Sequence, residues 1–258
     1  MAIVMHSGFN PDQVRTIRVN NKDKNMALYF MFMLPGILLM LWAQAKVKGS
    51  YGKYSKVANS KNITGAQAAR MVLDANGLHN VAIEMDNDPR RELSDHYDPR
   101  RRTLVLSQGI YRVPSIAAVA VAAHEAGHAI QHATGYAPLK TRTAIVPLVN
   151  IGSNLGFIVL FAGLFMNMVG LAWAGVVLFA LSTVFAAITL PVEFDASKRA
   201  KVALVQAGIV DGGVAGGPEG KGVDTMLDSA AWTYVAGFAA SLMTLLYYVM
   251  LVTGMRRD

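Results

Sequence analysis

The chain has 258 residues, of which 53% are hydrophobic and only 16% charged, and its formal net charge is +7. This composition argues against an ordinary soluble domain. The absence of cysteine excludes disulfides and thiolate metal sites. Because no basic run is interleaved with aromatic residues, the positive charge indicates attraction to a membrane surface rather than nucleic-acid binding.

Three stretches of more than 20 residues contain no charged residue: 25–45, 143–192 and 229–255, which are 21, 50 and 27 residues long. About 20 apolar residues are enough to cross the hydrocarbon of a bilayer. The longest stretch divides at 167–170, which predicts a hairpin of two helices over about 147–166 and 170–190. We therefore expect a mainly α membrane protein with about four transmembrane helices. The alternative is a large soluble core of buried helices, but such helices usually carry a charged solvent face.

The first charge-free stretch is not typical of a cleavable signal peptide. It follows a polar stretch of more than twenty residues, is long enough to span, and lacks a convincing small-x-small cleavage site. We therefore expect residues 1–25 to form a polar extension and 26–45 to remain as the first transmembrane helix.

The segment after the first span predicts a small α+β region. Thr64-Gly65-Ala66-Gln67 is a plausible capping box for a helix that reaches about Asn76 and ends at Gly77. Residues 81–85 and 103–106 have the composition of short strands.

Between these two strands, Asp98-Pro99 favours a turn. A small sheet beside a metal-binding helix often offers an edge to an extended substrate, so His96 and Tyr97 are candidates to line a cleft. The alternative is a hairpin with exposed polar residues, and the sequence favours neither.

An Ala- and Val-rich run over 115–134 predicts a helix that contains the pattern His124-Glu125-Ala126-Gly127-His128. Histidines four residues apart lie on one helix face, so their ring nitrogens can share one Zn²⁺. Glu125 points about 100° away, where it can take a proton from a metal-bound water without ligating the metal. This arrangement is typical of a zinc-dependent peptidase.

The alternative for this pattern is a surface helix with a chance His/Glu/His spacing. The residues before it are almost wholly apolar, however, and burying two histidines and a glutamate there is costly unless a metal or partners satisfy them. Gly127 lowers helix propensity by about 1 kcal/mol relative to alanine. A close approach of another backbone or of substrate would explain a glycine at this position.

A catalytic zinc ion needs a third protein ligand and an open position for water. His132 lies one turn further along the same helix, but three histidines at this spacing span about 12 Å, too far to bind one ion. The metzincin extension is also absent, because Gln131 and Thr134 replace its glycine and its last histidine. His132 is therefore a candidate for a structural or supporting role around the metal.

The better candidate follows the membrane hairpin, because a hairpin returns the chain to the side it left. Glu193 and Asp195 appear there, two residues apart, so their side chains diverge on a helix. We expect Glu193 to bind the metal. Asp195 is then expected to orient a ligand histidine or to pair with Arg199. The alternative is that both acids are ordinary charges at the membrane edge.

The motif at 124–131 together with Pro191-Val192-Glu193-Phe194 is a specific combination. With stretches 47–56, 64–78, 94–100, 135–154 and 190–200, it resembles the bacterial YugP-type membrane zinc metallopeptidases, whose layout is similar to that of HtpX/Ste24-like peptidases. The resemblance covers about residue 26 to the C-terminus. It implies a multi-pass membrane protein that binds one zinc ion through His124, His128 and Glu193, with Glu125 as the catalytic base.

Two features depart from the HtpX/Ste24-like pattern. Its aspartate four residues after the ligand glutamate is Ser197 here, and the acid stands at Asp195. Residues 1–25 and the glycine-rich segment 212–222 look like additions. The segment is not a P-loop, since Ala215 and Gly222 replace the first glycine and the Ser/Thr. This excludes a membrane AAA protease, in which the pentapeptide also occurs.

The expected reaction is hydrolysis of peptide bonds, with membrane-associated or misfolded proteins as substrates. His96, Tyr97 and Tyr136 are candidates to stabilise the oxyanion or contact substrate. The alternative from another class is a non-catalytic zinc-binding membrane scaffold or quality-control adaptor. The presence of Glu125 argues against it, because a purely structural zinc site has no use for a general base.

We therefore divide the chain into seven parts: 1–25, polar extension; 26–45, first span; 46–142, soluble zincin-like catalytic region; 143–192, hairpin; 193–228, third-ligand helix and glycine-rich loop; 229–255, last span; and 256–258, tail. The distribution of Lys and Arg favours a cytoplasmic catalytic region in a bacterial cell membrane, although charges close to the first span are nearly balanced. Expected partners are a peptide or protein substrate, the lipid bilayer, and a second copy or another membrane protein, but no nucleic acid.

Overall fold

The computed structural model describes residues 11–88, 90, 93–210 and 217–255. Residues 212–216 of the predicted glycine-rich segment 212–222 lie outside the described residues, as do the tail 256–258 and residues 1–10 of the polar extension. In the described part the chain is mainly helical, with one small sheet, as the sequence predicts.

Four long helices correspond to the predicted spans: α1 (Pro11–Tyr54), α5 (Ala137–Phe165), α6 (Val169–Gln206) and α7 (Pro218–Gly254). Each is long and apolar enough to cross a membrane, because its sequence offers a charge-free stretch of at least about 20 residues. The turn between α5 and α6 lies where the sequence places it, and Asn167 adopts a positive φ of 54° there. All four helices extend beyond their apolar stretches into polar sequence.

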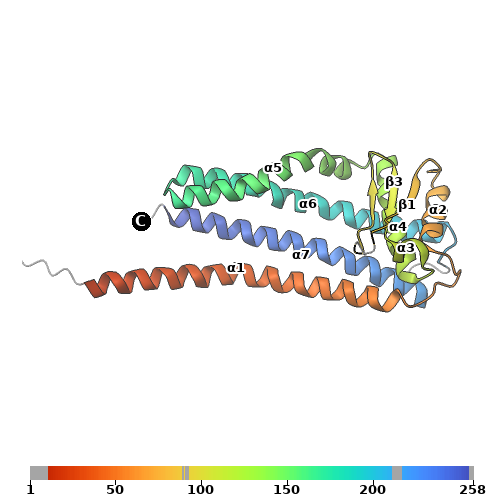
Figure 1. Cartoon of the computed structure of the whole chain (residues 1–258), viewed down its shortest axis with the longest axis horizontal. Coiled ribbons are helices and arrows are strands. Elements are labelled where there is room, and N and C mark those ends of the chain that lie inside the picture. Colours follow the sequence, from red (N-terminus) through yellow and green to blue (C-terminus); the bar gives the residue numbers. More distant parts are fainter. Residues whose placement is uncertain (1–10, 89, 91–92, 211–216, 256–258) are drawn as a thin grey trace, which may run out of the picture.

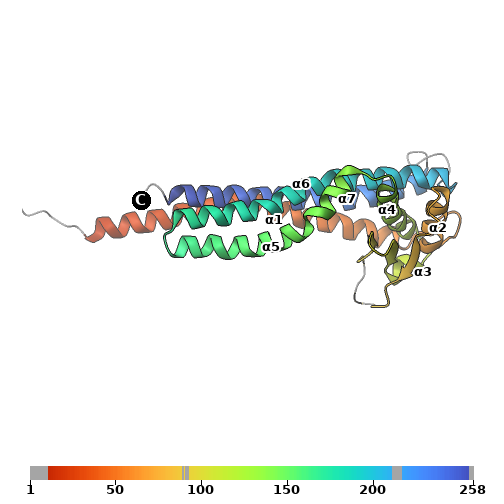
Figure 2. The same ribbon diagram turned by 90° about the horizontal axis from the view of Figure 1, so that it is seen from above.

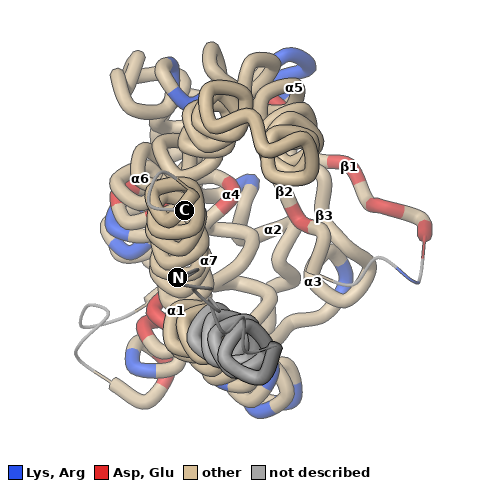
Figure 3. The backbone as a smooth tube through the Cα atoms, turned by 90° about the vertical axis from the view of Figure 1, so that its left-hand side faces the viewer, with Lys and Arg blue, Asp and Glu red and all other residues tan. Residues whose placement is uncertain are grey.

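The long helices form an open, curved row. α5 packs along α6, α6 against α7 and α7 against α1, and Figure 3, viewed along the helices, shows this order. α5 contains Pro147, which removes one backbone hydrogen bond, and Figure 2 shows that α5 changes direction along its length. The two termini of the described chain lie at the same end, away from the small sheet (Figure 1).

The other end of the molecule carries the short elements α2 (Gly65–Ala75), α3 (Gln108–Arg112), α4 (Ile116–Ala133), β1 (Ala82–Met85), β2 (His96–Asp98) and β3 (Thr103–Leu106). The predicted capping box is present at Thr64 and Gln67, and Gly77 has a positive φ of 71°. The sheet order is β1-β3-β2, with β1 parallel and β2 antiparallel to β3. The sequence does not predict α3 or the edge strand β2, whose three residues are held by pairing with β3.

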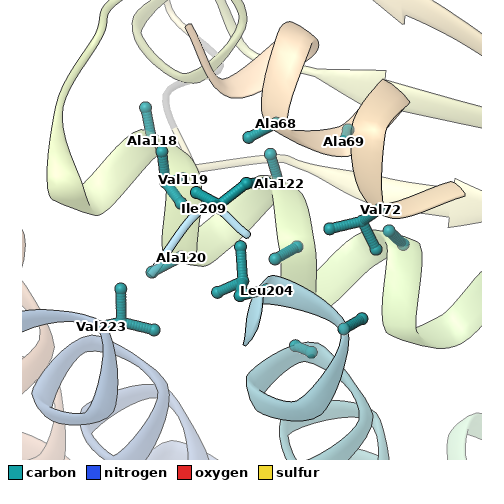
Figure 4. Packing of buried hydrophobic residues seen from close by; sticks show 14 of the residues in the cluster. Ala68, Ala69, Val72, Ala118, Val119, Ala120, Ala122, Leu204, Ile209 and Val223 are labelled. Atoms are coloured by element: carbon teal, nitrogen blue, oxygen red, sulfur yellow. The ribbon is translucent and has the colours of Figure 1, made fainter. Parts of the chain in front are cut away.

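The core joins the short elements to the long helices. Small side chains such as Ala68, Ala118 and Ala122 let α2 and α4 pack closely. Leu204 near the end of α6 and Ile209 in the turn after it fill the space beside them (Figure 4). These residues are almost fully buried. Since burial of apolar side chains is the main stabilising contribution, this core fixes α4 against α6.

Candidate metal centre and cleft

His124 and His128 of α4 face Glu193 of α6. The ligand atoms of these three residues all lie within 4.8 Å of one another. Nε2 of His124 is 3.2 Å and Nε2 of His128 is 3.5 Å from Oε2 of Glu193. Four ligands around a tetrahedral zinc ion, at about 2.0–2.1 Å from it, lie about 3.3 Å apart. Both the chemistry and the spacing of these donors therefore fit Zn²⁺.

The other ring nitrogen of each histidine has its own oxygen partner. Nδ1 of His124 lies 3.1 Å from Oγ of Ser197, and Nδ1 of His128 lies 3.0 Å from Oε1 of Gln131. A histidine that donates from Nδ1 keeps its Nε2 lone pair for a metal. These contacts therefore orient both rings toward Glu193.

Asp195 supports the orientation of His128 indirectly, through Gln131. Nε2 of Gln131 donates to Oδ2 of Asp195 at 2.9 Å and to the Val192 carbonyl oxygen at 2.7 Å. Asp195 also pairs with Arg199 at 2.5 Å, as the i,i+4 spacing predicts. The structure thus places Asp195 behind His128, with Gln131 between them, and not beside Glu193.

Sequence reasoning missed the contacts of Ser197 and Gln131 with the histidines. Ser197 stands one helical turn after Glu193, at the position where the HtpX/Ste24-like pattern has its aspartate, and this spacing was the available signal. Gln131 stands three residues after His128, which puts both on one face of α4.

Gly127 allows α4 to lie directly against α6. A Cβ atom at this position would be 2.4 Å from the carbonyl oxygen of Ala196. The glycine is therefore explained by the close approach of another backbone, one of the two causes that the sequence suggests. This contact sets the separation between the two helices that carry the three candidate ligands.

Glu125 lies where two cavities meet. A cleft of about 290 Å³ and a smaller pocket of about 180 Å³ share Asp95, Glu125 and Tyr234 in their walls. Glu125 is only 8% exposed, and burial raises the pKa of its carboxyl, while His124 and His128 act in the opposite direction. A buried carboxylate with a raised pKa suits an acid–base role.

The cleft lies between β2 on one side and the first turns of α5 on the other. Of the predicted oxyanion candidates, His96 and Tyr97 line it. The Tyr97 hydroxyl is 2.8 Å from Nδ1 of His132, so His132 contacts a cleft residue rather than the candidate ligands. Tyr136 is not in the cleft wall: its hydroxyl lies 3.4 Å from the Pro191 carbonyl oxygen.

Two further cleft residues were not predicted from the sequence. Arg142 of α5 donates from Nη1 to Oε1 of Glu193 at 3.0 Å, and Tyr234 of α7 lies beside the same carboxylate. Arg142 is the last charge before the long apolar stretch, which was a usable signal. Tyr234 lies inside an apolar stretch, and only the packing of α7 against α6 brings it to the site.

Comparison with known proteins agrees with this geometry. The profile of the family described as "Putative neutral zinc metallopeptidase" matches residues 29–253. The chain belongs to this zinc metallopeptidase family. It is 42% identical over 231 residues to the "Putative membrane protease YugP" of Bacillus subtilis (strain 168), an alignment that covers 90% of this chain and 99% of that protein. No solved structure matches. The family thus confirms the resemblance inferred from the sequence motifs.

Proposed function

We propose that this zinc metallopeptidase family member is an active endopeptidase with one zinc ion per chain, held by His124, His128 and Glu193. The position of Glu125 carries the proposal: this buried carboxylate lies beside the candidate ligands and in the wall that two cavities share. A peptide that passes from the cleft into the smaller pocket would cross directly over Glu125. The smaller pocket, lined by Ala120, Val121 and Leu227 among others, suits an apolar side chain.

His124, His128 and Glu193 would hold the zinc ion, which would supply the Lewis acidity for activating a water and polarising the scissile carbonyl. Glu125 takes a proton from the attacking water and gives it to the leaving amine. Tyr234 offers a hydroxyl donor at the wall of the cleft, where it can stabilise the developing negative charge. Arg142 balances the charge of Glu193 and holds it through Oε1.

The edge strand β2 provides a place for the substrate backbone. β2 pairs with β3 on one side only, and His96 and Tyr97 of this strand line the cleft. An extended peptide can add to such an edge through main-chain hydrogen bonds. We therefore propose that substrates bind as an extended strand along β2, with the scissile bond over Glu125.

Zinc content and turnover of the purified protein test this proposal together. We expect about one zinc per chain in the wild type and in Asp195→Ala, and loss of zinc in Glu193→Ala. Glu125→Gln should keep its zinc while hydrolysis of a mixed-sequence peptide library falls about 100- to 10,000-fold. A Glu125→Gln variant that cleaves at the wild-type rate would end the assignment of this residue. Zinc binding with no turnover in the wild type would favour the scaffold alternative.

We also propose that the catalytic end lies in the cytoplasm and acts on membrane-associated or misfolded proteins. The positive charges of the 46–142 region support this orientation. Because the chain has no cysteine, single cysteines are clean reporters of sidedness. A Lys61→Cys variant should resist a membrane-impermeant maleimide in intact cells and react after lysis. Labelling in intact cells would show that the catalytic end lies outside the cytoplasm.

A further inference from the structure

The cleft opens at the edge of the membrane-spanning region. Glu193 directly follows the charge-free stretch 143–192, and Arg142 directly precedes it. The wall of the cleft on α5 includes Leu139, Thr143 and Pro147, so it begins in polar sequence and continues into apolar sequence. A peptide bond cleaved over Glu125 therefore lies close to the membrane surface.

The α5 face that lines the cleft continues into the membrane-spanning part of the helix. Positions 143, 147, 150 and 154 follow an i, i+4, i+7, i+11 spacing and fall on one helix face. Asn150 and Asn154 extend the row begun by Thr143 and Pro147, and both are exposed. The row thus leads from the cleft, past Pro147, into the apolar part of α5.

In the described part of the chain, neither asparagine side chain forms a hydrogen bond to another helix. Each carries an amide in a stretch that lacks any charge. The Asn154 amide donates only to the backbone oxygen of Asn150, on the same helix, at 2.9 Å. Asn150 itself has no side-chain partner among the described residues. A polar amide in hydrocarbon is costly when unpaired and commonly hydrogen-bonds to a neighbouring helix.

The face of α5 that carries Asn150 and Asn154 is exposed, so a neighbouring helix can reach it. The four long helices form an open row in which α5 packs along α6 rather than α7. On α7, three residues after the cleft residue Tyr234, a Cβ atom added to Gly237 would meet no atom within 4 Å. Farther from the cleft α5 and α7 are in contact, since the rings of Phe161 and Tyr248 are 6.5 Å apart.

We propose that this face of α5 docks a transmembrane helix of the substrate, through Asn150 and Asn154. The inference rests on the proposed peptidase function and specifies its substrate class: a membrane-anchored protein that is cut in the extended segment next to its own span. Continuity between the docking face and the cleft favours a substrate helix over a second copy of the chain. Docking raises the local concentration of the scissile segment at Glu125.

Disulfide crosslinking tests the docking step without requiring turnover. The probe is a synthetic Leu/Ala transmembrane helix with one central serine and one cysteine, mixed with the full chain in proteoliposomes. Asn154→Cys should crosslink to the probe under mild oxidation. Leu155→Cys is the matched control, because Leu155 is 45% exposed but points about 100° away at the same depth. Equal crosslinking at both positions, or none at Asn154→Cys, would overturn the proposal.

Steady-state kinetics test whether docking on α5 speeds up cleavage. A peptide cleaved by the wild type is compared, free and joined to the same Leu/Ala helix. We expect kcat/KM to be about 100-fold higher for the joined substrate. Asn150→Trp with Asn154→Trp should remove most of this preference and leave the free peptide unchanged, whereas Leu148→Trp with Leu155→Trp, on another exposed side of α5, should keep it.

The remaining outcomes are distinguishable. Equal slowing of both substrates in the Asn150/Asn154 variant, together with a change of oligomeric mass in detergent, would assign the face to a second copy of the chain and refute substrate docking. If the wild type cleaved neither substrate, the peptidase proposal would fail, and the crosslinking result would still decide whether the face binds a helix.

Discussion

Replacing Gly127 with alanine should weaken zinc binding by separating α4 from α6. The new Cβ would lie 2.4 Å from the Ala196 carbonyl oxygen, whereas an ordinary contact begins near 3.4 Å. The helices must therefore move apart by about 1 Å, and metal–ligand distances tolerate only about 0.2 Å. His124 and His128 would move with α4, away from Glu193 on α6.

The expected cost follows from the size of this clash. Overpacking of this kind costs about 1–3 kcal/mol, and each 1.4 kcal/mol is a tenfold change in an equilibrium constant. If the zinc-free protein relaxes the clash, zinc affinity falls about 5- to 150-fold. The better helix propensity of alanine, about 1 kcal/mol, partly offsets the loss in overall stability but not the loss in zinc affinity.

Competition with a fluorescent chelator in detergent measures the zinc affinity, and thermal unfolding reports the fold. Gly49→Ala in α1 is the matched control, because a Cβ atom there would meet no atom within 4 Å. It should bind zinc as the wild type does. Wild-type affinity in Gly127→Ala would refute the argument that this backbone contact sets the ligand spacing.

Three other predictions concern the surroundings of the site. Ser197→Ala should weaken zinc binding about 10- to 100-fold with the fold intact, because Nδ1 of His124 loses its oxygen partner; unchanged affinity would exclude this role. Removal of zinc by a chelator should lower the unfolding temperature, since zinc at 100 times its Kd contributes about 2.7 kcal/mol, and added zinc should restore it. Burial raises the pKa of Asp95 above its usual 3.8, although Ser107 donates two hydrogen bonds to it. The folded state therefore binds this proton more tightly than the unfolded state, so the wild type should lose stability relative to Asp95→Asn as the pH rises through and above about 4. Unfolding curves of both zinc-free proteins from pH 3.5 to 7 check this; a constant difference would contradict it.

Much of the fold could be predicted because its signals are local. Charge-free stretches longer than about 20 residues determine the four long helices. The capping box at Thr64 marks the start of α2, and Gly77 marks its end. β2 and α3 could not be predicted in this way. β2 has only three residues, and its extended conformation depends on pairing with β3. Its own sequence is therefore too short to predict it.

The same distinction applies to the site. The spacing of His124 and His128 follows from helix periodicity, and the hairpin returns residues 193–195 to the same end of the molecule, so the sequence itself determines the two histidines and limits the third ligand to Glu193 or Asp195. Ser197, Arg142 and Tyr234 make their contacts at the site through the packing of α4, α5 and α7 around α6, whereas Gln131 meets His128 on the same helix. Tertiary structure also decided which acid faces the histidines, because residues two apart on a helix point in different directions and only the orientation of α6 selects one.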